Sequence, residues 1–129
     1  MFMEECAEFR ITPVQYSVLT VLERQPDLDQ ATLGVQVGID RATLAGVLSR
    51  LVRRGLIDRR AGETDRRMKL ASLSAEGQAL LKRIDQSAER AHERTIAPLP
   101  PERRAAFLRD LAYLVSANNG YGRTALDLP

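Results

Sequence analysis

Two helix-start signals only eleven residues apart constrain the fold of this chain more than any other feature. Asp29 and Asp40 are residues of the type that caps a helix N-terminus, and Gly38 between them suits a helix C-terminus. The first helix must therefore be short, with Leu33 and Val37 as its apolar positions. Two such helices joined by a tight turn form a helix-turn-helix.

The second of these helices has two distinct faces. Leu44, Val47, Leu48 and Leu51 recur at helical spacing and predict one buried stripe. The other face mixes small side chains, which let a backbone approach base edges, with arginines that reach guanine or phosphate. Its members, all expected to contact DNA, are Arg41, Thr43, Ala45, Gly46, Ser49, Arg50 and Arg53.

Gly46 lies in the middle of this helix, where glycine costs about 1 kcal/mol relative to alanine. Close approach of a DNA partner would explain why glycine stands there. The alternative is loose packing against another helix.

Capping signals also delimit the flanking helices. Thr12-Pro13-Val14-Gln15 combines a capping box with proline at the first helical position, and Pro26 ends that helix. Its expected apolar stripe is Val18, Val21 and Leu22. Ser74 caps a long helix that runs to about Ile96. After Pro98, Pro100 and Pro101, a last helix carries the apolar stripe Phe107, Leu108, Leu111, Leu114 and Val115.

The segment between these helices changes to a strand pattern. Residues 56–60 and 68–73 predict two short strands joined by a polar turn over 61–67. This hairpin would form a wing beside the helix-turn-helix. We expect Arg66 at its tip to enter a narrow minor groove, where the negative potential is enhanced.

Other charged residues of the wing have different expected roles. A carboxylate near phosphates would be repelled, so Asp65 should pair with Arg67 and stiffen the wing. Arg67 is also a candidate DNA contact. Arg60 at the base of the wing, like Arg53 on the helix, should favour phosphates.

The positive charge of the chain is concentrated in this same region. The formal net charge is only +2, yet residues 41–69 hold nine basic side chains against three acidic ones. Residues 1–40 hold two against seven. Eight of the nine cations are arginines, whose planar guanidinium groups suit phosphates and guanine edges. A solvated charged surface is the alternative, but the local elements favour DNA.

Several classes of function are disfavoured. The chain has one cysteine and one histidine, and it carries no glycine-rich phosphate loop, nucleophile elbow or zinc motif. We therefore expect no enzyme activity, cofactor or metal. No apolar run is long enough to span a membrane, and the acidic start, Met1 to Glu5, is unlike a signal peptide. These features predict a cytoplasmic protein.

The charges of neighbouring residues argue against two more specific functions, a redox sensor and a metal site. A redox-sensing Cys6 would need a lowered pKa, whereas Glu4, Glu5 and Glu8 would raise it. His92 could join acidic neighbours around a metal, but alternating charges at helical spacing predict a solvated, salt-bridged face. The residues of that face are Glu89, Arg90, Glu93 and Arg94.

Residues 12–77 resemble the MarR family of winged helix-turn-helix regulators. The resemblance rests on the segment 12–16, on Leu51 to Arg59 after the second helix, and on Asp65-Arg66-Arg67 followed by Leu73-Ser74. It implies a mainly α fold and one domain over residues 1–129. In that domain 12–77 forms the DNA-binding lobe, while 1–11 and 78–129 form a dimerisation region.

The resemblance further implies a homodimer whose two recognition helices enter successive major grooves about 34 Å apart, on a pseudo-palindromic operator. Such proteins usually repress, and a small ligand releases them from DNA. The family's use of these helices makes Phe9, Tyr16 and Ile84 pocket candidates, with core packing as the alternative. The segment Asn118 to Arg123 is similar to the tail of members that respond to aromatic carboxylates or their thioesters.

One departure from the family concerns the first helix. Only eleven residues precede Thr12. We therefore expect either a start further upstream or a reduced dimer interface and pocket roof. Two other functions stay open: a helical dimeric interaction module that binds an acidic partner, and a DNA-binding protein without a ligand.

Overall fold

Helices make up most of the structure, a computed structural model that describes residues 1–121. All the predicted helices and both predicted strands are present, which confirms the mainly α winged helix-turn-helix fold. In chain order the elements are α1 (Phe2–Glu5), the 3₁₀ turn η1 (Ala7–Phe9), α2 (Pro13–Arg24), β1 (Leu28–Asp29), α3 (Gln30–Val37), α4 (Arg41–Arg53), β2 (Ile57–Ala61), β3 (Lys69–Leu73), α5 (Ala75–Ile96), α6 (Pro101–Ala117) and the 3₁₀ turn η2 (Asn119–Tyr121).

The predicted caps fix where the helices begin and end. Gly38 and Gly55 adopt left-handed φ values of 78° and 71° at the ends of α3 and α4, a conformation that suits glycine. At the helix starts, backbone N–H groups donate to capping side chains: Gln15 to Thr12 (3.1 Å), Thr32 to Asp29 (3.0 Å), Thr43 to Asp40 (2.9 Å) and Gly77 to Ser74 (3.0 Å).

The wing is a three-stranded antiparallel sheet in the order β1-β3-β2. The sequence pattern predicted β2 and β3 but not β1. In β1, Leu28 pairs with Ala71 and Asp29 with Leu70. A two-residue strand exists only through these distant partners, so no local period could reveal it.

The core lies where α2, α3, α4 and α5 meet the sheet. Helix α4 buries its predicted stripe, and α2 buries Val18, Leu19 and Leu22. The prediction for α2 was wrong at two positions: Val21 is only half-buried, and Leu19, which was not expected in the stripe, is completely buried. Helix α2 packs against α3, β3 and α5 at once, so its buried face is wider than a single stripe.

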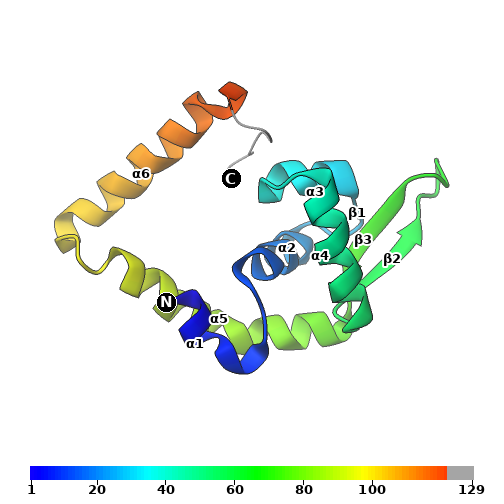
Figure 1. The fold of residues 1–129 in the computed structure, drawn as a ribbon, viewed down its shortest axis with the longest axis horizontal. Coiled ribbons are helices and arrows are strands. Elements are labelled where there is room, and N and C mark those ends of the chain that lie inside the picture. The colour runs from blue at the N-terminus through cyan, green and yellow to red at the C-terminus, as the bar shows by residue number, and fades with distance from the viewer. Residues whose placement is uncertain (122–129) are drawn as a thin grey trace.

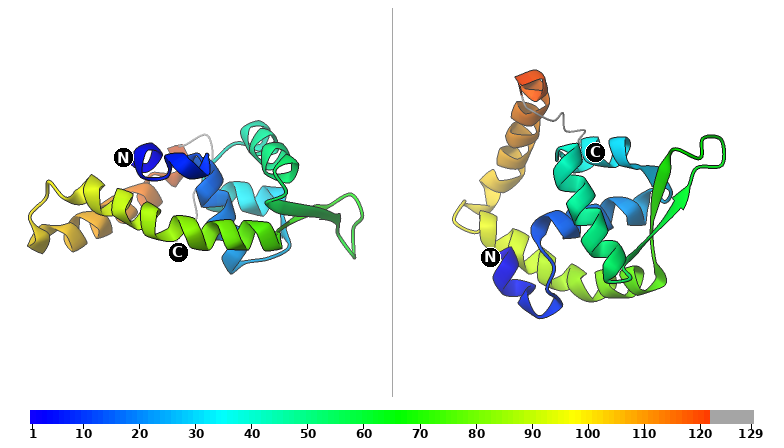
Figure 2. Two further views of the ribbon diagram at one scale, coloured as in Figure 1. Left: turned by 90° about the horizontal axis from the view of Figure 1, so that it is seen from below. Right: turned by 45° about the vertical axis from the view of Figure 1, so that its right-hand side comes forward.

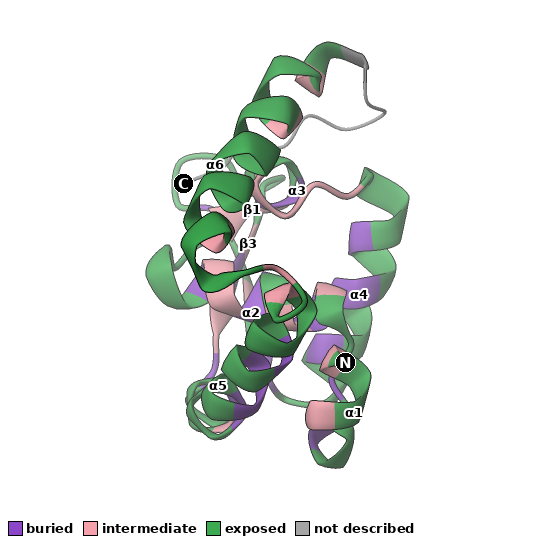
Figure 3. Ribbon diagram, turned by 90° about the vertical axis from the view of Figure 1, so that its left-hand side faces the viewer, coloured by how far each residue is buried: buried purple, intermediate pink, exposed green. Residues whose placement is uncertain are grey.

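Helix α5 runs beneath this core, and α6 leaves its far end and projects away from the rest of the chain (Figures 1 and 2). Helix α6 contains no buried residue, and its ribbon is exposed along most of its length (Figure 3). Among residues 1–121, no helix is long and apolar enough to cross a bilayer.

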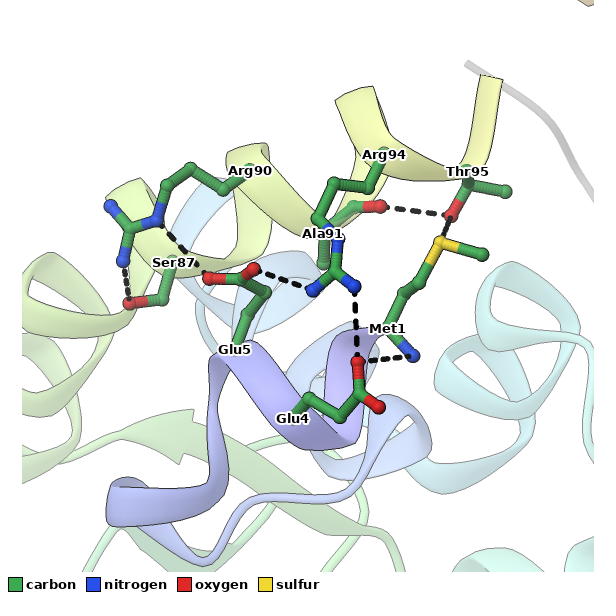
Figure 4. A network of polar contacts seen from close by, with 8 residues as sticks. All are labelled: Met1, Glu4, Glu5, Ser87, Arg90, Ala91, Arg94 and Thr95. Carbon is green, nitrogen blue, oxygen red and sulfur yellow. Dashed lines mark hydrogen bonds and ion pairs between the residues drawn. The ribbon is translucent and has the colours of Figure 1, made fainter. Parts of the chain in front are cut away.

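Helix α1 packs on α5, and a network of ion pairs joins the two helices (Figure 4). The Glu5 carboxylate accepts hydrogen bonds from Arg94 (2.8 Å) and Arg90 (3.2 Å), and Arg94 also pairs with Glu4 (3.3 Å). These bonds, from Arg94 first and then Arg90, lower the pKa of Glu5. The predicted salt-bridged face of α5 therefore exists, but its arginines pair with α1 and not with Glu89 and Glu93. Local spacing could not show a partner more than eighty residues away.

Candidate nucleic-acid interface

The two faces of α4 divide as predicted. Its leucine and valine stripe is buried in the core, and all seven candidate DNA-reading residues are exposed on the opposite side. The N-cap residue Asp40 also fixes the side chain of Thr43, whose hydroxyl donates to the Asp40 carboxylate at 2.8 Å. Because that hydrogen is engaged, Thr43 can present only an acceptor and a methyl group to a base edge, and the methyl suits thymine.

Gly46 faces open space. A Cβ atom built at this position would meet nothing within 4 Å. In the described part of the chain, therefore, no other helix packs over Gly46. The small residue leaves the α4 backbone accessible to a partner outside this chain.

A groove of about 740 Å³ lies between the start of α4 and the wing. Three cations line it: Arg41 from α4, and Arg67 and Lys69 from the wing. Sequence reasoning missed Lys69, because its strand pattern gives no information about its neighbours across the groove. Asp29 and Asp40 also line the groove, where both cap helices. Hydrogen bonds from Thr32 lower the pKa of Asp29.

Asp65 shapes the wing tip, but not by the predicted pairing. Its carboxylate accepts the backbone N–H of Arg67 (3.0 Å), and its carbonyl accepts the N–H of Met68 (3.1 Å). The prediction of an ion pair with the Arg67 guanidinium was wrong, since within residues 1–121 no such pair forms. A short aspartate side chain reaches the backbone two residues on more easily than a side chain. The guanidinium groups of Arg66 and Arg67 are consequently not held by Asp65.

Arg60 at the wing base is occupied by a partner that the sequence did not indicate. Its guanidinium donates to Asp27 from Nε (2.9 Å) and lies 2.9 Å from the second oxygen of the same carboxylate. Ser72 donates a further hydrogen bond to Asp27 (2.6 Å). The Arg60 bond first, and then that from Ser72, lower the pKa of Asp27 to about 2. Arg60 thus joins β2 to the loop before β1, an ion pair that its expected role at phosphates did not include.

Arg59 makes a second link from the wing. It donates to the Gln30 side chain (3.1 Å), which in turn donates to the Arg41 carbonyl (3.4 Å). These contacts connect the wing base to the starts of both helices of the helix-turn-helix.

Two of the three pocket candidates lie in the packed interior. Phe9 and Ile84 belong to the hydrophobic core of the single chain, which is the alternative that the sequence left open. Tyr16 is half-buried, with its ring 5.4 Å from that of Phe2 and 6.5 Å from that of His92. Of the three candidates, Tyr16 alone keeps an accessible surface for a ligand.

Cys6 lies between α1 and η1 and is buried. Burial first, and then the Glu5 and Glu8 carboxylates, raise the pKa of its thiol. This environment disfavours thiolate chemistry. Among residues 1–121, no group of three or more His, Cys, Asp or Glu side chains is placed to hold a metal ion.

The predicted dimerisation stripe is exposed in the single chain. The exposed fractions of its larger side chains are 45% to 56%, and Val115 is half-buried. Only the first part of the predicted ligand-responsive tail is described, since Gly122 and Arg123 lie outside the described residues.

An exposed helix of small and basic residues, set beside an arginine-tipped wing, defines a winged helix-turn-helix protein. Residues 11–69 match the MarR family. CouR, a transcriptional repressor solved bound to a 23-mer DNA duplex, is 32% identical with a TM-score of 0.81, over 88% of this chain and 80% of CouR. The chain belongs to the MarR family.

Two further relatives resemble this chain. BpsR of Bordetella bronchiseptica, solved to explain the regulation of its DNA binding by 6-hydroxynicotinic acid, is 29% identical with a TM-score of 0.83, over 88% of this chain and 81% of BpsR. A Thauera aromatica protein assigned as transcriptional regulator of the hcr operon is 32% identical over 98 residues, or 76% of this chain. This chain spans 59% of the length of that relative.

Proposed function

We propose that this protein is a homodimeric, sequence-specific transcriptional repressor that a small aromatic acid, or its thioester, releases from DNA. The observation that carries the proposal is the exposed face of α4, on which small side chains lie beside a basic groove, together with arginines that form no ion pair within residues 1–121. A protein that only bound acidic partners would not need an unobstructed glycine in the middle of that face. We propose a regulator and not an enzyme, acting in the cytoplasm where its DNA target lies.

The residues would contact different parts of the DNA according to their position. Arg41, Thr43, Ala45, Gly46, Ser49 and Arg50 would face the major groove, while Arg66 would reach the minor groove. Arg53 and Arg67 would contact phosphates. Because Asp27 occupies Arg60, we assign Arg60 to holding the wing in place.

The dimer would form through the terminal regions, residues 1–11 and 78–129, around the DNA-binding lobe of residues 12–77. Exposed leucines and Phe107 on α6 support this division, since an apolar face in water is stabilised by burial against a partner. Two copies would then place their α4 helices in successive major grooves.

The effector class is supported by BpsR, whose DNA binding responds to an aromatic carboxylic acid. A ligand releases DNA only if it prefers the geometry that does not bind DNA. A preference of about 1–3 kcal/mol changes affinity about 5- to 150-fold. We place the ligand beside Tyr16, between the dimerisation region and the DNA-binding lobe.

Selection of bound duplexes from a randomised DNA pool at about 150 mM salt tests the proposal, because non-specific binding is weak there. We expect an enriched pseudo-palindrome with half-sites one helical turn apart. That duplex then serves as the probe in a screen of aromatic acids and their thioesters. Binding without any enriched motif would instead support an interaction module for acidic partners, and enrichment without a releasing ligand would support ligand-independent repression.

A further inference from the structure

A second pocket lies at the C-terminal end of α4. Its volume is about 450 Å³, and it opens between the last turn of α4 and the start of α2. It is lined by four arginines and one glutamine: Arg10, Gln15, Arg50, Arg53 and Arg54.

The positive charge of this pocket is not compensated. In residues 1–121, none of its four arginines forms an ion pair. Arg54 instead donates to the backbone carbonyls of Arg10 (2.7 Å) and Phe9 (3.1 Å), which holds its guanidinium at the pocket. Like charges around one small pocket repel each other. An anion bound between the arginines would attract each of them and so offset this repulsion.

Gln15 adds an unused donor. Its side chain is buried, with 8% of the residue exposed, and its carbonyl oxygen accepts the Thr12 N–H at 3.0 Å as part of the capping box. That bond engages only the oxygen of the amide, so a donor remains on its nitrogen. It has no partner within residues 1–121. This nitrogen is therefore free to donate to an acceptor atom bound in the pocket.

We propose that this pocket binds an oxyanion of phosphate type. Several acceptor oxygens and up to two negative charges match the guanidinium groups and the amide better than a single carboxylate does. The phosphate group could be carried by a soluble molecule or by the DNA backbone. Arg50 belongs both to this pocket and to the exposed face of α4, so a soluble phosphate would compete with DNA for Arg50.

The first experiment contains no DNA and does not depend on the proposed function. Thermal unfolding of the full chain is followed while inorganic phosphate replaces chloride at constant ionic strength. We expect a saturable rise in the unfolding midpoint. Phosphate also strengthens burial non-specifically, but that effect is shared by every variant.

Two variants and one control separate the effects. Gln15→Glu keeps the capping box, which accepts either residue, but directs a carboxylate into the pocket, so the saturable rise should disappear. Arg53→Gln should weaken phosphate binding about tenfold or more, the effect of losing a charge-assisted hydrogen bond. Arg24→Gln changes an exposed arginine in the last turn of α2 and should behave as the unaltered protein.

The second experiment identifies the source of the phosphate. It measures the salt dependence of binding to the selected duplex. Saturable phosphate binding that displaces DNA indicates a soluble ligand. If free phosphate does not bind, but Gln15→Glu reduces the salt slope by about one, the DNA backbone supplies the phosphate. A reduced slope for Arg53→Gln alone would show only the phosphate contact already proposed for Arg53.

The site is refuted if phosphate produces no saturable effect and Gln15→Glu leaves the salt slope unchanged. The arginines would then serve only the C-terminal end of α4. If the unaltered protein selects no DNA, the proposed function fails, and the first experiment alone decides whether the site exists.

Discussion

At Gly46, we expect one substitution to have opposite effects on the stability of the fold and on DNA binding. Apart from its chain neighbours and the backbone of its own helix, no atom of the described chain lies within 4 Å of the position that its Cβ would occupy. Gly46→Ala should therefore stabilise the fold, by about 0.5–1 kcal/mol, because alanine favours the helix. The same methyl group should weaken DNA binding if the backbone approaches base edges. Urea unfolding and a DNA titration check the two effects, and an unchanged affinity would show that α4 does not approach the bases closely at this position.

Asp27 gives the wing a pH-dependent anchor. Its pKa is about 2 in the folded protein, below the ordinary value of 3.8, because Arg60 and Ser72 stabilise the carboxylate. A lowered pKa contributes stability above the ordinary value, and that stability is lost as the pH falls through about 2. Asp27→Asn should therefore destabilise the protein at pH 7 and make little difference near pH 2. Thermal unfolding over that range measures the gap, and a gap that stays constant with pH would contradict the role of the ion pair.

At the scale of elements, local chemistry explains what the sequence could predict. A cap is a contact over three residues, so Thr12, Asp29, Asp40 and Ser74 marked the helix starts correctly. The hairpin followed from its change of period. Strand β1 did not, because it depends on a strand some forty residues later.

The site was predictable to the same extent. Helical spacing indicated which residues of α4 are exposed. It could not indicate the Asp27 partner of Arg60, 33 residues away, or the groove that brings Lys69 beside Arg41. The arginine-lined pocket at the C-terminal end of α4 was also missed, since Gln15 was interpreted only as half of a capping box.

Helix α6 should be the element that holds two copies together. Leu111 lies in its exposed apolar stripe, and an aspartate there would place a charge in the proposed interface. We expect Leu111→Asp to yield a folded monomer that no longer binds DNA, as measured by analytical ultracentrifugation and DNA titration. Tyr113→Asp is the control, because Tyr113 is 72% exposed and lies off the stripe. A Leu111→Asp protein that remains dimeric would place the interface elsewhere.

The shape of the whole molecule indicates that a single copy is incomplete. The core closes over α2 to α5 and the sheet, while α6 extends away without burying any residue (Figure 1). If a second copy covers α6, association stabilises the fold by mass action. The unfolding midpoint should then rise with protein concentration, and the Leu111→Asp variant should show no such rise. A concentration-independent midpoint in the unaltered protein would argue for a stable monomer.

The burial of Cys6 provides a way to follow the N-terminal segment in solution. It is the single thiol of the chain, it is 1% exposed, and its raised pKa keeps it protonated. A thiol-reactive reagent attacks the thiolate, so labelling requires the segment to lift from α5 first. The labelling rate, compared with that of the unfolded chain, therefore reports the free energy of this local opening. Cys6 thus allows the strength with which the ion pairs of Glu5 hold the start of the chain to be measured without a substitution in the protein.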